Sequence, residues 1–326
     1  MKKYRVIFVG AGVLILALLF YSFGVQKTID DILAMGWRFW IIAGIFLFNN
    51  IFMTIAWKVL INHPVRPSYY LQLFLARVAG DSTSSVNAMA SAAGEALKAI
   101  YIKDVVPIQT GLASVVLDRT IHIISNVLMM LTGIVISFFV LNIPLWVSIG
   151  TLAAFVLLFY MMMVILRKQR QGFVRYLLTR IPVRWLDRFM NEKRWEKVDT
   201  LDGDISFVFS TRETMKSFYL SLAIHYLSGF FFSSLEIYLI VIFSGNSITF
   251  MHSMFLYIFS MFLTSVIFFM PANLGTSEGS FSLALQFLGY DPAIGLTVGL
   301  IKRLRTLVWS LIGIIILFFA GMTRKG

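Results

Sequence analysis

Two short stretches place carboxylates next to residues that break helices, inside sequence that is otherwise apolar. Residues 270–279 read Met-Pro-Ala-Asn-Leu-Gly-Thr-Ser-Glu-Gly and contribute Asn273 and Glu278. In lipid, an unpaired backbone group costs several kcal/mol, so irregular backbone persists only where protein or water covers it. A proline and glycine break that carries an acid at membrane depth therefore indicates a functional site.

A second break interrupts the apolar sequence earlier in the chain. Residues 79–87 read Ala-Gly-Asp-Ser-Thr-Ser-Ser-Val-Asn, and Gly94-Glu95 follows. Small and hydroxyl residues at this density allow close backbone approach and satisfy exposed backbone groups. We predict two half-length helices with a polar tip. Arg77 and Asp81 could form an i,i+4 pair or line a cavity, and the sequence leaves both readings open.

The two glutamates need basic partners. A carboxylate near a helix start gains about 0.3–1 kcal/mol, less than the roughly 2.5–3.5 kcal/mol cost of a charge at the centre of a membrane helix. Arg119 and Arg303 are the candidates for Glu95 and Glu278. Either two buried ion pairs lock the breaks, or the arginines bind a lipid phosphate, which their planar fork suits. In the second reading the glutamates orient the arginines or meet a cationic headgroup.

Further charged residues lie within predicted spans. Lys302 and Arg305 accompany Arg303, and since the three bases cannot all face lipid, we expect Arg303 and Arg305 to line the interior. We expect Asp118 to pair with a neighbouring base. We interpret three other intramembrane residues as helix–helix contacts, in preference to a proton relay: His122, His225 and Glu236.

Composition places the whole chain in the membrane. Of 326 residues, 59% are hydrophobic and only 13% are charged, against roughly 25% charged in soluble domains. The net charge is +12, and the basic residues lie between apolar runs. This pattern predicts how the protein is oriented in the membrane and does not indicate nucleic-acid binding. The absence of cysteine excludes thiol chemistry, and four scattered histidines predict no metal site or cofactor.

The expected fold is an all-α polytopic membrane protein, treated as one domain over residues 1–326. It has about six full transmembrane helices and two broken re-entrant hairpins. Residues 167–213 form a basic segment in which Arg180, Arg184 and Arg188 recur every four residues, as in an amphipathic helix on an anionic leaflet. A solvated linker is an equal alternative for this segment. The full spans are expected at 6–23, 39–60, 108–141, 144–166, 215–243 and 293–319.

Charge and spacing predict an inverted repeat. Basic residues at both termini and in 167–213 should be cytoplasmic, and the two broken hairpins must then enter from opposite faces. Gly111 precedes Arg119 by eight residues, and Gly295 precedes Arg303 by the same eight. Repeat units of about 69–141 and 250–320 would meet near the midplane, where transporters place substrate sites.

The sequence resembles the flippase-like transmembrane region of bacterial lysylphosphatidylglycerol synthases. Ala-Ala-Gly-Glu-Ala-Leu-Lys, ending at Lys98, resembles the family's Gly-Glu segment. Residues 113–119 resemble its acidic-Arg span, and residues 271–278 match its Pro-x-x-x-Gly-x-x-Glu hairpin, which Arg303 follows. Residues 89–91 lack the proline that members commonly carry there. The resemblance implies the lipid-translocating part, and we expect a stand-alone member without the synthase domain.

The expected function is lipid translocation in the plasma or inner membrane, without enzymatic activity. The alternatives are a lipid-modifying enzyme with Glu95 or Glu278 as general base, and a small-solute transporter. The chain contains no Walker A loop, so the energy for transport would come from a gradient of substrate, protons or ions. A membrane phospholipid is the expected partner, and a homo-oligomer is one of the states that the sequence allows. The candidate substrate-binding residues are Arg77, Asp81, Glu95, Lys98, Arg119, Asn273, Glu278, Arg303 and Arg305.

Overall fold

Four helices of 22 residues or more form the frame of the part of the chain that the structure describes. The computed structural model describes residues 30, 33–61, 63–84, 88–140, 192–207, 211–267, 270 and 273–323, with isolated positions between 149 and 179. The predicted spans 6–23 and 144–166 and the basic helix of Arg180, Arg184 and Arg188 lie outside these residues, isolated positions apart. The long helices are α3 (Phe39–Leu60), α6 (Ile108–Val140), α11 (Arg212–Phe243) and α14 (Ala293–Thr323).

Every regular element that the structure describes is helical, as the apolar sequence predicts. Within the residues that the structure describes, three helical stretches are long and apolar enough to cross a membrane: Leu33–Leu60, Ile108–Ser137 and Arg212–Phe243. Helix α14 has 31 residues and carries three bases in its first half. The class of multi-pass membrane protein is therefore confirmed.

The two broken stretches fold into pairs of short helices. The first pair is α4 (Tyr70–Ser84) and α5 (Ala88–Tyr101), and the second is α12 (Phe250–Val266) and α13 (Thr276–Phe287). A helix of 12 to 17 residues is about 18–26 Å long at 1.5 Å per residue, less than the roughly 30 Å hydrocarbon core. The short helices are thus too short for an untilted crossing.

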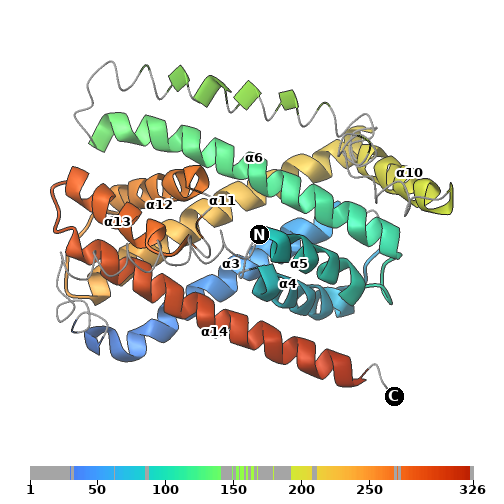
Figure 1. Cartoon of the computed structure of the whole chain (residues 1–326), viewed down its shortest axis with the longest axis horizontal. Coiled ribbons are helices and arrows are strands. Elements are labelled where there is room, and N and C mark those ends of the chain that lie inside the picture. The colour runs from blue at the N-terminus through green and yellow to red at the C-terminus, as the bar shows by residue number, and fades with distance from the viewer. Residues whose placement is uncertain are drawn as a thin grey trace, which may run out of the picture.

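The two pairs lie at opposite ends of the molecule, between α6 and α14 (Figure 1). Helix α4 packs against α14, and α12 packs against α6, while α3 and α11 form an extensive contact between them. Each short pair therefore contacts the long helix that belongs to the other part of the chain. Three shorter elements complete the described fold: η1 (Gly36–Arg38), η2 (Pro67–Tyr69) and α10 (Glu192–Phe207).

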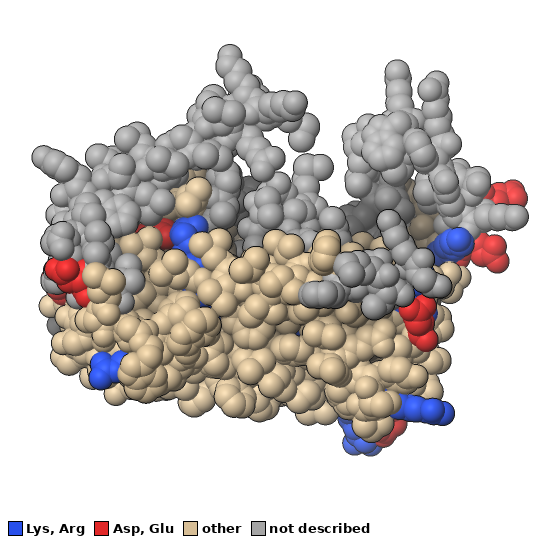
Figure 2. All heavy atoms as spheres, turned by 90° about the horizontal axis from the view of Figure 1, so that it is seen from below, with Lys and Arg blue, Asp and Glu red and all other residues tan. Residues whose placement is uncertain are grey.

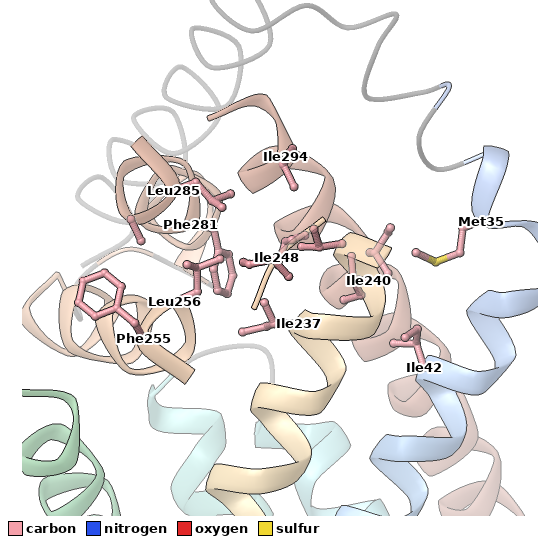
Figure 3. Packing of buried hydrophobic residues seen from close by; sticks show 14 residues of the cluster. Met35, Ile42, Ile237, Ile240, Ile248, Phe255, Leu256, Phe281, Leu285 and Ile294 are labelled. Carbon is pink, nitrogen blue, oxygen red and sulfur yellow. The ribbon is translucent and has the colours of Figure 1, made fainter. Parts of the chain in front are cut away.

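A buried apolar cluster fixes the second short pair in place. Phe281 and Leu285 of α13 pack with Leu256 of α12 and with Ile237 and Ile240 of α11 (Figure 3). Burying a side chain of this size contributes about 1.5–3 kcal/mol. The cluster holds α13 rigidly against the helices that carry the charged residues described below.

Glycine at position 295 lets α14 approach α13 closely. A Cβ atom at Gly295 would overlap the backbone of Ser282 and Phe281. Such an overlap with backbone cannot be relieved by rotating a side chain. The helix pair therefore depends on this residue having no side chain.

The outer surface carries a broad uncharged band. Figure 2 shows charged side chains gathered toward the two ends of the molecule, with uncharged residues across the middle of the visible face. Large apolar side chains are exposed on all four long helices. Exposed apolar area of this extent on a helical bundle is typical of a surface that faces lipid. Examples are Phe48, Ile123, Leu227 and Leu311.

Candidate functional site

The first turn of α13 holds Glu278 in a fixed position. Gly275 precedes the helix with φ of 74°, a conformation that glycine adopts without steric cost. The Gly275 N–H donates to Oε2 of Glu278 at 3.0 Å, and the Glu278 side chain is fully buried. A carboxylate at this position also faces the positive end of the helix.

Arg303 of α14 forms an ion pair with Glu278. Its Nε and Nη2 atoms donate to Oε1 of Glu278 at 2.9 and 2.6 Å. Gly299 makes the approach feasible, since a Cβ there would lie 2.7 Å from Cγ of Glu278. The Arg303 side chain remains 26% exposed, so the guanidinium is accessible from one side. The predicted Glu278–Arg303 pair is confirmed.

Glu236 of α11 receives the other two bases of α14. Its Oε2 atom lies 2.6 Å from Nζ of Lys302, and its Oε1 atom lies 2.9 Å from Nε of Arg305. The Arg305 guanidinium also stacks over the ring of Phe46, 3.9 Å from its centroid, a favourable cation–π geometry. Glu236 is therefore a contact between helices, as expected, and Arg305 lies inside as predicted.

Helix α14 therefore contributes two neighbouring groups of ion pairs. One is Arg303 with Glu278, and the other is Lys302 and Arg305 with Glu236. We call the five residues together the α14 cluster. They comprise three bases and two acids, and the additional base lies in the Glu236 group. The partly exposed Arg303 is next to Lys302 in sequence, so both groups make this end of the interior basic.

A second group of charged residues joins α4, α5, α6 and α11. Nζ of Lys98 lies 2.7 Å from Oδ1 of Asp81 and 3.1 Å from Oε2 of Glu95. Nη1 of Arg77 lies 3.3 Å from Oδ2 of Asp118 and donates to the carbonyl of Met53 at 2.9 Å. We call this group the α4 cluster: Arg77, Asp81, Glu95, Lys98, Asp118 and His225.

The expected i,i+4 contact between Arg77 and Asp81 is present at ion-pair distance, 3.8 Å. Both residues also belong to the larger cluster, so the two readings of the sequence are compatible. Asp118 pairs with a neighbouring base, as predicted. Asp81 is 45% exposed and Glu95 is 19% exposed, whereas Arg77 and Lys98 are buried. The accessible side of the α4 cluster is therefore acidic.

The predicted pair between Glu95 and Arg119 is wrong. Glu95 contacts Lys98, one turn along α5, and Arg119 is exposed on α6. Consecutive helical residues point about 100° apart, so the inward direction of Asp118 turns Arg119 outward. Gly80 allows the alternative contact, because a Cβ there would lie 2.5 Å from Cγ of Lys98. Glu95 is also not at a helix start, since α5 begins seven residues earlier at Ala88.

Asn273 contributes through its backbone. Its φ of 51° lies in the left-handed region, which asparagine tolerates better than most residues. Its carbonyl lies 3.5 Å from Nη2 of Arg303, a distance at the limit of hydrogen bonding. The residue shapes the turn before α13 and places its carbonyl next to the guanidinium.

Two contacts went beyond what the sequence predicted. Lys302 pairs with Glu236 although only the two arginines of α14 were expected inside. His225 faces Asp118, with Nε2 and Oδ1 3.2 Å apart. The only signal for either was an intramembrane charge in need of a partner. No group of three or more histidine or acidic residues within the described helices could hold a metal ion.

These observations define a polytopic helical membrane protein with two buried ionic clusters at the ends of paired short helices. The chain belongs to the family of the lysylphosphatidylglycerol synthase TM region, whose family model matches residues 5–313. The matched model covers the transmembrane region and not the synthase domain. No curated protein and no solved structure matches the chain.

Proposed function

We propose that the protein moves a phospholipid or related lipid between the two leaflets of the plasma or inner membrane. The family membership supports a lipid-related role. The observation that carries the proposal is the partly exposed Arg303 of the α14 cluster, which stands beside Lys302 in a set of three bases and two acids. A lipid phosphate is an anion that an arginine fork binds in a bidentate manner.

The depth of the clusters supports a site near the middle of the bilayer. Arg303 lies ten residues after the start of α14, and Asp118 lies ten residues after the start of α6. At 1.5 Å per residue each lies about 15 Å into its helix, half of the roughly 30 Å hydrocarbon core. A lipid phosphate at that depth would be in transit between leaflets.

We propose that the two units form an inverted repeat with re-entrant short helices. Packing of α4 on α14 and of α12 on α6 is the reciprocal exchange that a twofold relation produces. Rocking of one unit against the other would present the site to each leaflet in turn. In this arrangement both termini and residues 167–213 are cytoplasmic, and Arg180, Arg184 and Arg188 contact the anionic leaflet.

Within this site the residues have distinct proposed roles. Arg303 binds the phosphate, with Glu278 and the carbonyl of Asn273 orienting it. Arg305 and Lys302 keep the local charge positive through Glu236. On the other side, Asp81 and Glu95 accept a cationic headgroup, held in place by Lys98 and Arg77. Arg119 is exposed on the outer face of α6, outside the proposed site.

A catalytic role for the two glutamates has little support. Glu278 already accepts three hydrogen bonds, from Gly275 and from Arg303. Hydrogen bonds to the ionised form stabilise it and weaken a general base. Glu95 is likewise paired with Lys98. We therefore propose transport without chemistry on the lipid.

The test is transport by purified protein in vesicles of phosphatidylethanolamine and phosphatidylglycerol. A fluorescent headgroup label on phosphatidylethanolamine reports the fraction of lipid in each leaflet. We expect Arg303→Ala to slow exchange at least about tenfold, which corresponds to losing one charge-assisted hydrogen bond. Arg38→Ala is the control, since Arg38 lies in η1, outside both clusters. Equal exchange by wild type and Arg303→Ala would refute the site. Solute uptake without lipid exchange would favour a solute transporter.

A further inference from the structure

The side chains of Asp118 and His225 meet in the interior, between α6 and α11. His225 is fully buried, and the Asp118 side chain is almost so. Nε2 of His225 lies 3.2 Å from Oδ1 of Asp118, at ion-pair distance, and neither atom forms a hydrogen bond with the other or with any other described residue. The carboxylate's other oxygen contacts Arg77. The protonation of the pair therefore depends on the contact between Nε2 of His225 and Oδ1 of Asp118.

The two contacts of the His225 ring favour one proton more than a neutral histidine beside an ionised carboxylate would hold. Nδ1 of His225 lies 3.1 Å from the carbonyl oxygen of Ser221. A carbonyl only accepts, so this contact is a hydrogen bond when Nδ1 carries the hydrogen. Nε2 then faces Asp118, and an ionised carboxylate also only accepts. Either His225 is an imidazolium, or Asp118 is protonated and donates to Nε2. In both states the pair holds one additional proton.

The charges of the α4 cluster lead to the same proton count. Arg77 and Lys98 contribute two positive charges, and three carboxylates contribute three negative ones. The cluster is therefore negative by one unit when His225 is neutral and Asp118 ionised. The additional proton makes it electrically neutral, which a low-dielectric interior favours strongly.

The groups around His225 provide both its electrostatic environment and a connection to the exposed edge. The His122 ring lies 6.2 Å from the His225 ring, and Arg119 lies one residue after Asp118 on α6. From Asp118, contacts continue through Arg77 to Asp81, which is 45% exposed. The titratable groups around the pair come from three helices: Arg77 and Asp81 of α4, Glu95 and Lys98 of α5, and His122 of α6, whereas Arg119 of α6 points outward.

Helix α11 connects this pair to the α14 cluster. Glu236 follows His225 by eleven residues, which is close to three helical turns and returns to nearly the same face. His225 contacts α6 and Glu236 contacts α14. Any change in the contact between His225 and Asp118 would act on the packing of α11 against α6. The same rigid helix carries the acid that holds Lys302, next to Arg303.

We propose that the Asp118–His225 pair is a proton-binding site whose loading and release are coupled to lipid movement. The coupling rests on the proposed function, whereas proton binding by the pair does not. The proton comes from water on one side of the membrane and returns to water on the other. No bond other than N–H or O–H forms or breaks.

Proton binding is tested directly by nitrogen NMR of histidine-labelled protein in lipid nanodiscs. The signals of His225 are assigned by their loss in His225→Gln. We expect either two protonated ring nitrogens or a neutral ring that is hydrogen-bonded to a protonated Asp118. In the second case, infrared spectroscopy of the wild type should show a carboxylic-acid band that is absent from Asp118→Asn. A neutral ring beside an ionised Asp118 at neutral pH would overturn the proposal.

Coupling is tested by lipid exchange in the same vesicles with a pH gradient imposed. A difference of about one pH unit changes the occupancy of a single proton site up to tenfold, so we expect the gradient to change the wild-type exchange rate several-fold. His225→Gln and Asp118→Asn should exchange lipid at a rate that no longer depends on the gradient. His252→Gln, a matched change outside both clusters, should respond as wild type does.

The outcomes separate the two proposals. A gradient response that persists in folded His225→Gln and Asp118→Asn would overturn the coupling while leaving lipid transport intact. Absence of lipid exchange in wild type, with or without a gradient, would refute the proposed function and the coupling together. The NMR result would then decide proton binding on its own.

Discussion

The α4 cluster and the α14 cluster occupy related places in the two halves of the chain, yet the groups that they expose have opposite charges. Asp118 and Arg119 follow Gly111 by seven and eight residues, and Lys302 and Arg303 follow Gly295 by the same intervals. An acid therefore stands in one helix where a base stands in the other. One cluster is positive with an accessible arginine, and the other exposes carboxylates.

This difference indicates that the two clusters bind different ligands although similar helices position them. Paired short helices and a long helix position both clusters, but the α14 cluster suits a phosphate and the α4 cluster suits a proton or a cationic headgroup. The neighbouring arginines differ as well, since Arg303 points to Glu278 and Arg119 is exposed. Comparing matched substitutions in the two halves therefore tests each assignment.

The largest expected difference is in stability, between Glu278→Ala and Glu95→Ala. Removing one member of a buried ion pair costs about 3–5 kcal/mol, and Glu278 is fully buried against Arg303. Glu95 is partly exposed, and in Glu95→Ala the Lys98 side chain keeps its contact with Asp81. This substitution should therefore lower the free energy of unfolding by about 1 kcal/mol or less. Thermal unfolding in detergent measures both. Equal losses would show that the two glutamates are equivalent.

The second comparison concerns helix packing at Gly295 and Gly111. Gly295→Ala would overlap the α13 backbone and should destabilise by about 1–3 kcal/mol. Gly111→Ala would place its Cβ 3.5 Å from Cβ of Ala99, an ordinary contact, so its effect should lie within about 1 kcal/mol of zero. The same unfolding assay applies, and a more harmful Gly111→Ala would contradict the packing described.

The third comparison exchanges each arginine for lysine. Arg303→Lys keeps the charge but removes the fork that binds Glu278 and the proposed phosphate. We expect lipid exchange to fall about tenfold, or roughly 1.4 kcal/mol. Arg119→Lys should change exchange less than about twofold, because an exposed charge needs no fixed geometry. Equal effects would place the two arginines in the same role.

Sequence predicted the second half of the molecule better than the first. The break at 270–279 predicted the short helix, its glutamate and the partner at Arg303, because glycine, acid and base occur in a pattern that local helix geometry can complete. Gly275 with positive φ and Glu278 at the third position of α13 are direct consequences of that pattern.

The first half depended on tertiary packing that local sequence does not encode. Lys98 reaches Asp81 only because α4 and α5 approach closely at Gly80. His225 meets Asp118 from a helix more than one hundred residues away in sequence. An intramembrane charge predicts that a partner exists, but not which of several distant residues supplies it.

The most direct measurement is an electron cryomicroscopy structure of the protein in nanodiscs of phosphatidylethanolamine and phosphatidylglycerol. We expect phosphate density within hydrogen-bond distance, about 3 Å, of the Arg303 guanidinium, with no phosphate on the α4 cluster. Phosphate density on the α4 cluster, or an Arg303 bound only to Glu278 while lipid phosphates remain at the membrane surfaces, would contradict it.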